Sequence, residues 1–279
     1  MTIAWQEVAD RVWVRRYESL DQTIGAIGGD AGLTVIDTRA NHRLADELRD
    51  DLRALPGDVV AVVNTHGHWD HAFGNARFAP VPIWGHVRCV DFIAATGEEA
   101  RAKLIEEYPA EADAFREVAL TPPTEVFDDA ASVDLGGRRI ELRYLGLGHT
   151  DNDIVITVPD ASVLFAGDLL ENAPAPSFGD SFPISWPVTG QALLAHVDSV
   201  VVPGHGDPFD RSFAERQVGE LALLADLARE AASGAIGLDE AVRRSPFPPE
   251  PTGEALERTR LELGVSKLTR PTELFHSVE

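Results

Sequence analysis

The sequence predicts a mixed α/β (α+β) protein with a helical C-terminal appendage. Short runs rich in valine, isoleucine and leucine occur in both halves of the chain, and segments with the helical spacing of apolar residues lie between them. Beyond Asp210 helical spacing continues alone. We therefore expect a main domain over residues 1–210 and a helical region over residues 211–279 that packs on it.

The first half of the chain alternates β-rich runs with turn residues such as Gly28, Gly29 and Gly32. Three short strands precede a helix that ends at Pro56, and the apolar run after this proline is typical of a buried strand. The pattern predicts an antiparallel meander followed by a strand–helix–strand unit. The expected strands are 11–17, 23–28, 33–37 and 59–64, and the expected helix is 42–55.

The second half repeats the β-rich pattern after a helical segment. A stretch rich in proline, glycine and serine, residues 172–190, also holds three large aromatic residues, so we expect a structured surface loop there. Beyond Asp210 the spacing predicts a long helix to about residue 233 and two shorter helical pieces. The other expected elements are a helix over 88–118 and strands over 132–135, 139–145, 153–158, 162–166 and 199–202.

Composition and charge exclude several classes of function. The 279 residues include 24 basic and 46 acidic side chains, and the resulting net charge of −22 repels nucleic acids. No apolar run approaches the roughly 20 residues of a membrane-spanning helix, and the N-terminal stretch lacks the apolar core of a secretory signal. The single cysteine, Cys89, cannot form an intramolecular disulfide. We expect a cytoplasmic protein that acts on a small molecule, with no nucleic-acid or membrane partner and an open oligomeric state.

The main chemical signal is the motif THGHWDH at residues 65–71, directly after an expected strand. An H-x-H-x-D-H string arises by chance on the order of 0.001 times in a chain of this composition. Imidazole nitrogens and carboxylate oxygens bind zinc, iron or manganese. In an extended loop His66 and His68 point the same way, whereas Asp70 and His71 diverge from them, so one motif can serve two metal ions.

Three further candidate ligands stand at the ends of expected strands in the second half. They are His149 in LGLGHT, Asp168 in FAGD and His205 in PGHG. Flanking glycines let the backbone pack closely around a site. Each of these residues by itself is more often a structural turn residue, and only their conjunction with the motif at 65–71 favours a metal site.

In this order the motifs THGHWDH, LGLGHT, FAGD and PGHG, with Asp37 in VIDT, resemble those of the metallo-β-lactamase-fold superfamily of metallohydrolases. The resemblance covers roughly residues 10–210. It implies a four-layer αβ/βα sandwich with the metals at one edge of two facing sheets, which agrees with the two β-rich halves. Glyoxalase-II-like and lactonase-like members are nearest in general pattern, because a helical region follows the last histidine there too.

The resemblance also implies a role for each candidate residue. Asp37 would orient the motif loop by hydrogen bonds without touching metal. Asp70 would hold the attacking water in line or accept its proton, and Asp168 would be the second catalytic carboxylate. Two zinc ions are the expected cofactors, with iron or manganese as alternatives. The implied ligands are His66, His68 and His149 for one ion and Asp70, His71 and His205 for the other, with Asp168 bridging them.

Such a site implies a hydrolase in which metal hydroxide cleaves a small-molecule ester, thioester or lactone. No GxSxG motif competes with this mechanism. The alternative from another class is an oxidoreductase that resembles persulfide dioxygenases, with one iron ion on His66, His149 and Asp168. β-Lactamase activity ranks lower, because the β-lactamases that share HxHxDH typically lack a carboxylate at the position of Asp168. GHTDND also departs from the GHT-x-G-S/D pattern of glutathione thioesterases.

We expect the loop at 172–190 to form one wall of the substrate pocket, because the chain that leaves Asp168 must pass over the metal edge. Aromatic side chains would make this wall apolar, with anchoring of the loop to the core as the alternative. The remaining histidines are assigned to structure. The pocket candidates are Trp69, Phe178, Phe182 and Trp186, and the structural histidines are His42, His86, His196 and His276.

Overall fold

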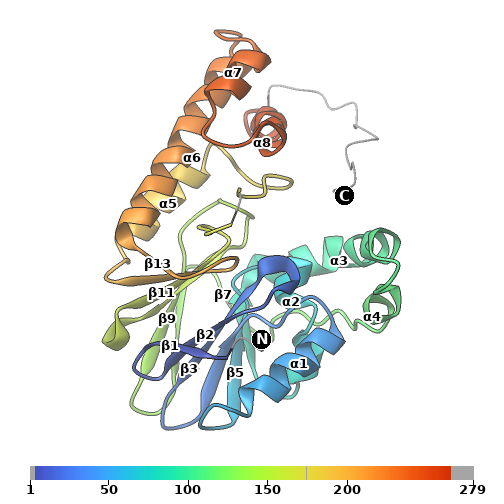
Figure 1. Cartoon of the computed structure of the whole chain (residues 1–279), viewed down its shortest axis with the longest axis vertical. Helices are drawn as coiled ribbons and strands as arrows, with labels where there is room; N and C mark the ends of the chain where they lie inside the picture. The colour runs from blue at the N-terminus through green and yellow to red at the C-terminus, as the bar shows by residue number, and fades with distance from the viewer. Residues whose placement is uncertain (1–3, 174, 265–279) are drawn as a thin grey trace.

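Two β-sheets face each other in the computed structural model, which describes residues 4–173 and 175–264, and helices cover both outer sides (Figure 1). The first sheet contains the predicted antiparallel meander and then three strands that join in parallel. In spatial order its strands are β1 (Gln6–Ala9), β2 (Val12–Arg16), β3 (Thr23–Gly28), β4 (Leu33–Ile36), β5 (Val59–Val63), β6 (Ile83–His86) and β7 (Glu125–Phe127).

The second sheet has one parallel pair, β11 with β12, and antiparallel pairs elsewhere. In spatial order its strands are β13 (Phe209–Asp210), β12 (Val200–Pro203), β11 (Val163–Gly167), β10 (Ile154–Val158), β9 (Arg139–Tyr144) and β8 (Ala130–Asp134). Both sheets therefore place a parallel pair near their middle, and the carboxyl ends of these pairs define the edge where the site lies.

Helix α1 (His42–Leu52) shows how the sequence builds the strand–helix–strand unit. The side chain of Asn41 accepts hydrogen bonds from the backbone N–H groups of Arg43 and Leu44, which caps the first turn. The buried positions Ala45, Leu48 and Leu52 lie on one face of the helix at a spacing of three and four residues. This face packs on the outer side of the first sheet.

Three apolar layers follow from the period-two alternation of the strands. In β10, Ile154 and Ile156 face the first sheet, whereas Val155 faces the helices on the other side. A central cluster fills the space between the sheets, a second lies under α1, and a third lies between the second sheet and the helices α5 (Trp186–Leu194) and α6 (Arg211–Ala232). The architecture is the four-layer αβ/βα sandwich expected from the sequence motifs.

The C-terminal segments are helical, as predicted. Helices α6, α7 (Leu238–Arg244) and α8 (Pro249–Glu262) gather at one end of the molecule, in orange to red in Figure 1. None of the helices within the described residues has the length and apolar character needed to cross a lipid bilayer.

Some predicted elements were wrong in detail. The helix expected over 88–118 is two helices, α3 (Val87–Glu107) and α4 (Ala112–Arg116), because Pro109 disfavours helical geometry at Tyr108. The loop at 172–190 is shorter than expected, since Pro187 lies in the first turn of α5. Strands β1, β7 and β13 and helix α2 (Trp69–Ala72) were missed because each has only two to four residues.

We predict that Gly25→Ala destabilises the fold. A Cβ atom at residue 25 in β3 would lie 2.2 Å from the ring of Phe165 in β11, so the facing sheets would have to shift. Overpacking of this kind costs about 1–3 kcal/mol of unfolding free energy. Gly219→Ala in α6 is the matched control, because a Cβ there meets open space and alanine favours helix. Denaturant unfolding measures both, and wild-type stability of Gly25→Ala would contradict the close sheet packing.

Candidate metal centre

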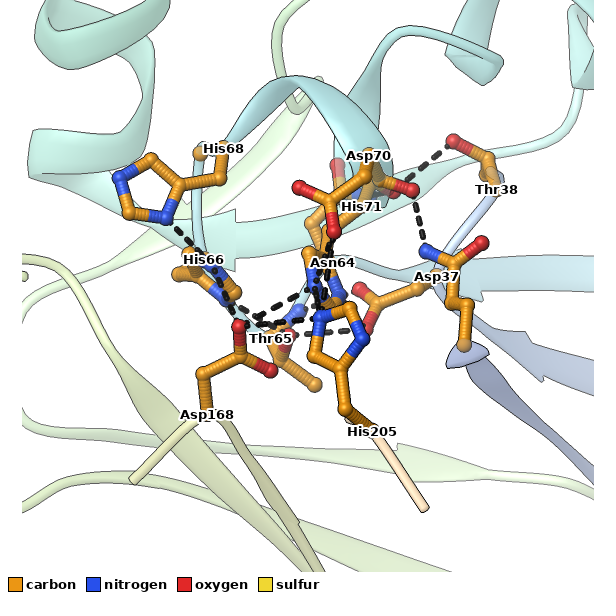
Figure 2. A network of polar contacts seen from close by, with 12 residues as sticks. Asp37, Thr38, Asn64, Thr65, His66, His68, Asp70, His71, Asp168 and His205 are labelled. Carbon is orange, nitrogen blue, oxygen red and sulfur yellow. Dashed lines mark hydrogen bonds and ion pairs between the residues drawn. The ribbon is translucent and has the colours of Figure 1, made fainter. Parts of the chain in front are cut away.

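All seven predicted ligands lie together at one edge of the two sheets. The chain leaves β5 into the motif loop 65–71, leaves β11 at Asp168 and leaves β12 toward His205, while His149 stands in the connection that enters β10. Figure 2 shows Asp168 and His205 approaching the motif loop from the opposite side. Carboxyl ends of parallel strands meet at one edge, which explains how residues so distant in sequence converge.

The first donor set consists of three imidazole nitrogens. The Nδ1 atom of His68 lies 3.0 Å from Nε2 of His66 and 2.9 Å from Nε2 of His149. All three side chains are largely shielded from solvent, and their ligand atoms lie within 4.8 Å of one another. These are the residues assigned to one ion from the sequence motifs.

The second donor set is a nearly equilateral triangle. Nε2 of His71 lies 3.3 Å from Nε2 of His205 and 3.3 Å from Oδ2 of Asp70, and the third side, from His205 to Asp70, is 3.2 Å. Tetrahedral zinc with bonds of about 2.1 Å places its ligand atoms about 3.4 Å apart. The triangle therefore matches the spacing of three zinc ligands.

One carboxylate oxygen stands between the two sets. Oδ2 of Asp168 lies 3.7 and 3.6 Å from the Nε2 atoms of His66 and His149, and 3.4 Å from those of both His71 and His205. Its other oxygen, Oδ1, is buried and has no hydrogen-bond partner among the described residues. A buried carboxylate oxygen without a partner is costly, so these residues fit a metal-binding centre in which Asp168 could serve either donor set.

Close backbone packing makes room for this carboxylate. A Cβ atom at Gly204 would lie 1.9 Å from Oδ1 of Asp168. The N–H of Gly204 donates to the carbonyl of Gly167, whose positive φ of 53° favours glycine. Close packing at Gly204 and the positive φ of Gly167 thus explain why PGHG and FAGD have glycine at these positions.

Most of the five histidines in the donor sets are fixed by a hydrogen bond on the ring nitrogen that faces away from the centre. Asp37 does this for His71, with 2.8 Å between Oδ2 and Nδ1, and it also accepts from the N–H and the hydroxyl of Thr65. The backbone carbonyl of Leu20 does it for His205 at 2.8 Å. Asp37 therefore orients the motif loop while its oxygens stay outside the two donor sets.

Charge and burial shift the proton affinities of the donors strongly. Burial opposes a charge on His68, but the carboxylates of Asp180, Asp70 and Asp168 together outweigh it and raise the pKa of His68 to about 9. Burial, with the charge on His68, lowers the pKa of His149 to about 4. Burial also opposes the charge on His71, but the Asp168 and Asp70 carboxylates hold its pKa well above the usual value.

The centre opens into a cavity of about 670 Å³. Trp69, from the motif, and Phe92, from α3, lie on one side of it. The segment after Asp168 also lines the cavity, with small or acidic residues, namely Glu171, Ala173, Ala175, Ser177, Gly179 and Asp180. The loop thus borders the cavity, but its own aromatic residues do not.

The prediction that Phe178 and Trp186 line the pocket was wrong. Both are fully buried in the cluster between the second sheet and α5 and α6, and the Trp186 indole donates to the carbonyl of Leu169. Phe182 is half-buried and lies 5.9 Å from the guanidinium of Arg258. Large aromatic rings gain more from burial in the core than from a half-exposed wall, and here they anchor the loop.

Two functional candidates in the segment after Asp168, Glu171 and Asp180, were not predicted from the sequence. Oδ2 of Asp180 lies 3.0 Å from Nε2 of His68. A carboxylate oxygen of Glu171 lies within 4.8 Å of the ligand atoms of His149 and Asp168, and burial, with the charge on Asp168, raises the pKa of Glu171 to about 8. They are the only charged residues between 169 and 190, and this isolation in an otherwise uncharged stretch is the sequence signal that marks them.

The histidines assigned to structure lie outside the donor sets where the structure describes them. His42 accepts a hydrogen bond from the N–H of Ala119, and His86 caps α3 and stacks on Tyr144. His196 follows α5. His276 lies outside the described residues.

Comparison with known proteins identifies the family. A sequence profile of the metallo-beta-lactamase superfamily matches residues 20–205. The chain belongs to this superfamily, as the motifs indicated.

Individual relatives share the fold at modest identity. The metallo-beta-lactamase type 2 of Bacillus cereus is 24% identical over 222 residues, covering 75% of this chain and 79% of that protein. The Bacteroides fragilis enzyme of the same name is 37% identical over 100 residues, covering 34% of this chain and only 40% of its own length. The inverting sec-alkylsulfatase Pisa1 from Pseudomonas sp. matches 94% of this chain and 50% of its own, with a TM-score of 0.73 and 17% identity.

We predict that Asp168→Ala lowers the metal content below two ions per chain, because its oxygen lies between both donor sets. Elemental analysis after gel filtration measures the loss. His42→Ala is the control, since His42 contacts Ala119 and not the centre. Two ions per chain in Asp168→Ala would show that this carboxylate is not shared.

We also predict that metal binding to stripped protein releases protons at pH 7.5. His68 has a pKa raised to about 9, so it is protonated below that pH and must lose this proton to bind metal. His71 and His205, whose pKa values are also raised by the neighbouring carboxylates, must lose their protons too. Metal affinity should therefore rise with pH over the range in which these rings titrate. Calorimetry in buffers of different ionisation enthalpy counts the protons, and binding without release would contradict the protonated state of His68.

Proposed function

We propose that this protein is a metal-dependent hydrolase that cleaves an ester, thioester or lactone bond of a small molecule. The observation that carries the proposal is the pair of three-donor sets with Asp168 between them, open to a cavity of about 670 Å³. Two zinc ions held there would supply a water molecule acidic enough to attack at neutral pH and positive charge for the oxyanion that forms.

Asp70 is the residue best placed to handle the proton of the attacking water. It borders the cavity, and its backbone carbonyl is held by the side-chain amide of Gln22. Burial opposes its charged form, but the neighbouring His71 and His205 keep the pKa of Asp70 well below the usual value. Asp70 therefore stays an anion that can orient water and accept a hydrogen bond from it.

A covalent nucleophile is not supported. The only cysteine, Cys89, is fully buried, and burial raises the pKa of its thiol, so little thiolate forms at neutral pH. Trp69 and Phe92 instead give the cavity an apolar side against which an acyl group can pack. A small-molecule substrate and a cytoplasmic location remain part of the proposal, supported by the acidic composition and the lone cysteine.

Away from the metal ions, the cavity offers few cationic side chains that could bind an anionic substrate. Besides Asp70 and Asp168, which belong to the donor sets, four carboxylates border it, and Lys103, which pairs with Glu99, is the only lysine or arginine among the described lining residues. β-Lactam antibiotics carry a carboxylate and sulfate esters carry a sulfate, and Lys103 is the one lysine or arginine among the described lining residues that could pair with such a group.

A panel of chromogenic esters, thioesters and lactones, together with metal analysis, tests the proposal. We expect turnover of at least one acyl class by protein that holds two zinc ions. The dioxygenase alternative requires one iron ion per chain and oxygen uptake with a persulfide, with no acyl turnover. That result would overturn the hydrolase proposal.

We predict that kcat/KM is at least tenfold higher for a neutral ester than for the same ester with a carboxylate on its acyl chain. At pH 9 Glu171, whose pKa is raised to about 8, carries a negative charge beside the centre. Glu171→Gln removes this charge and should narrow the ratio at that pH. Glu106→Gln, on the exposed side of α3, is the control and should leave the ratio unchanged. A ratio unaffected by Glu171→Gln would remove this residue from substrate selection.

A further inference from the structure

The loop at residues 178–186, here called the bracing loop, bonds to one predicted metal ligand and to the backbone of residues adjacent to two others. Asp180 reaches Nε2 of His68, the ring nitrogen opposite to the one that faces the donor set. The N–H of Phe182 donates to the carbonyl of Gly148, next to His149, at 2.9 Å. The indole of Trp186 donates to the carbonyl of Leu169, next to Asp168, at 3.1 Å.

Helix α8 holds this loop from the other side. The guanidinium of Arg258 donates to the carbonyls of Asp180 and Ser181, each at 3.0 Å. One turn further along the helix, the carboxylate of Glu262 accepts from the N–H groups of Ile184 at 2.8 Å and Ser185 at 3.0 Å. Residues four apart share one helix face, so a single face of α8 binds both ends of the turn.

We infer that α8 is a positioning element of the metal centre, which acts through Asp180 to fix the ring of His68. Asp180 follows Gly179, a residue with wide backbone freedom. The planar guanidinium of Arg258, bonded to two successive carbonyls, fixes the backbone that carries Asp180. The inference gives the C-terminal region, which lies beyond the matched residues 20–205, a role in metal binding.

The inference rests on the metal centre of the proposed function but not on its substrate. A carboxylate that accepts from the far nitrogen of a metal-binding imidazole sets the tautomer and the direction of the ring, and loss of such a partner typically weakens metal binding about 10–100-fold. An exclusively structural role of α8 would lower thermal stability without changing metal affinity in folded protein.

Zinc titration against a chelating dye tests the inference at a temperature where every variant is folded. We expect Asp180→Ala to weaken one of the two zinc equivalents about 10–100-fold, and Arg258→Met, which keeps the aliphatic stem, to weaken the same equivalent on the order of tenfold. Arg258→Lys should recover part of the loss. Arg260→Met, exposed on the same helix, is the control and should bind zinc as the wild type does.

A double-mutant cycle shows whether Arg258 acts through Asp180. If it does, Asp180→Ala combined with Arg258→Met loses no more affinity than Asp180→Ala alone. Additive losses of affinity would show that Arg258 does not act through Asp180. Wild-type zinc affinity in Arg258→Met, even with a lowered melting temperature, would show that α8 has only a structural role. Both readouts are independent of substrate, so absence of acyl hydrolysis would leave this test intact.

Discussion

Five imidazoles and two carboxylates meet in one largely buried cluster, and much of the chain serves to hold their ligand atoms toward a common centre. Each ring has one nitrogen that faces the centre and one that faces away, and a hydrogen bond on the second nitrogen helps to decide where the first one points. Asp37 and the carbonyl of Leu20, near the start of the chain, and Asp180, in its second half, are such partners. The geometry of the centre therefore depends on contacts that only the complete fold brings together.

The two sheets provide the rigidity that this cluster requires. Parallel pairs lie near the middle of both sheets, so the ends of β5, β11 and β12 are fixed by strands on either side. The glycines that follow these strands let backbone segments approach closely enough for Asp168 to stand between the donor sets. The strand ends fix the positions of the segments that follow them, and these short segments carry the candidate ligand residues.

The segment after Asp168 contributes residues both to the cavity lining and to the surroundings of the donor sets. The same stretch of chain carries Glu171 and Asp180, which border the cavity, and then buries Phe178 and Trp186 in the core. Burial of the aromatic rings fixes the backbone, and the fixed backbone presents the carboxylates to the cavity. Lys103 is the only lysine or arginine among the described residues that line the cavity.

The sequence by itself determined the fold class, most strands and the clustered metal-binding motifs, because period-two and helical spacing and the H-x-H-x-D-H string are local signals. It also indicated the helical C-terminal segments, although Pro109 and Pro187 moved helix boundaries. Only the tertiary structure decided which way the residues of 172–190 face, since a large aromatic side chain suits a pocket wall and a core equally well until its neighbours are known. The pairing of Asp180 with His68, and its support by Arg258, joins positions 112 and 78 residues apart, and no local pattern encodes contacts that arise when distant elements pack.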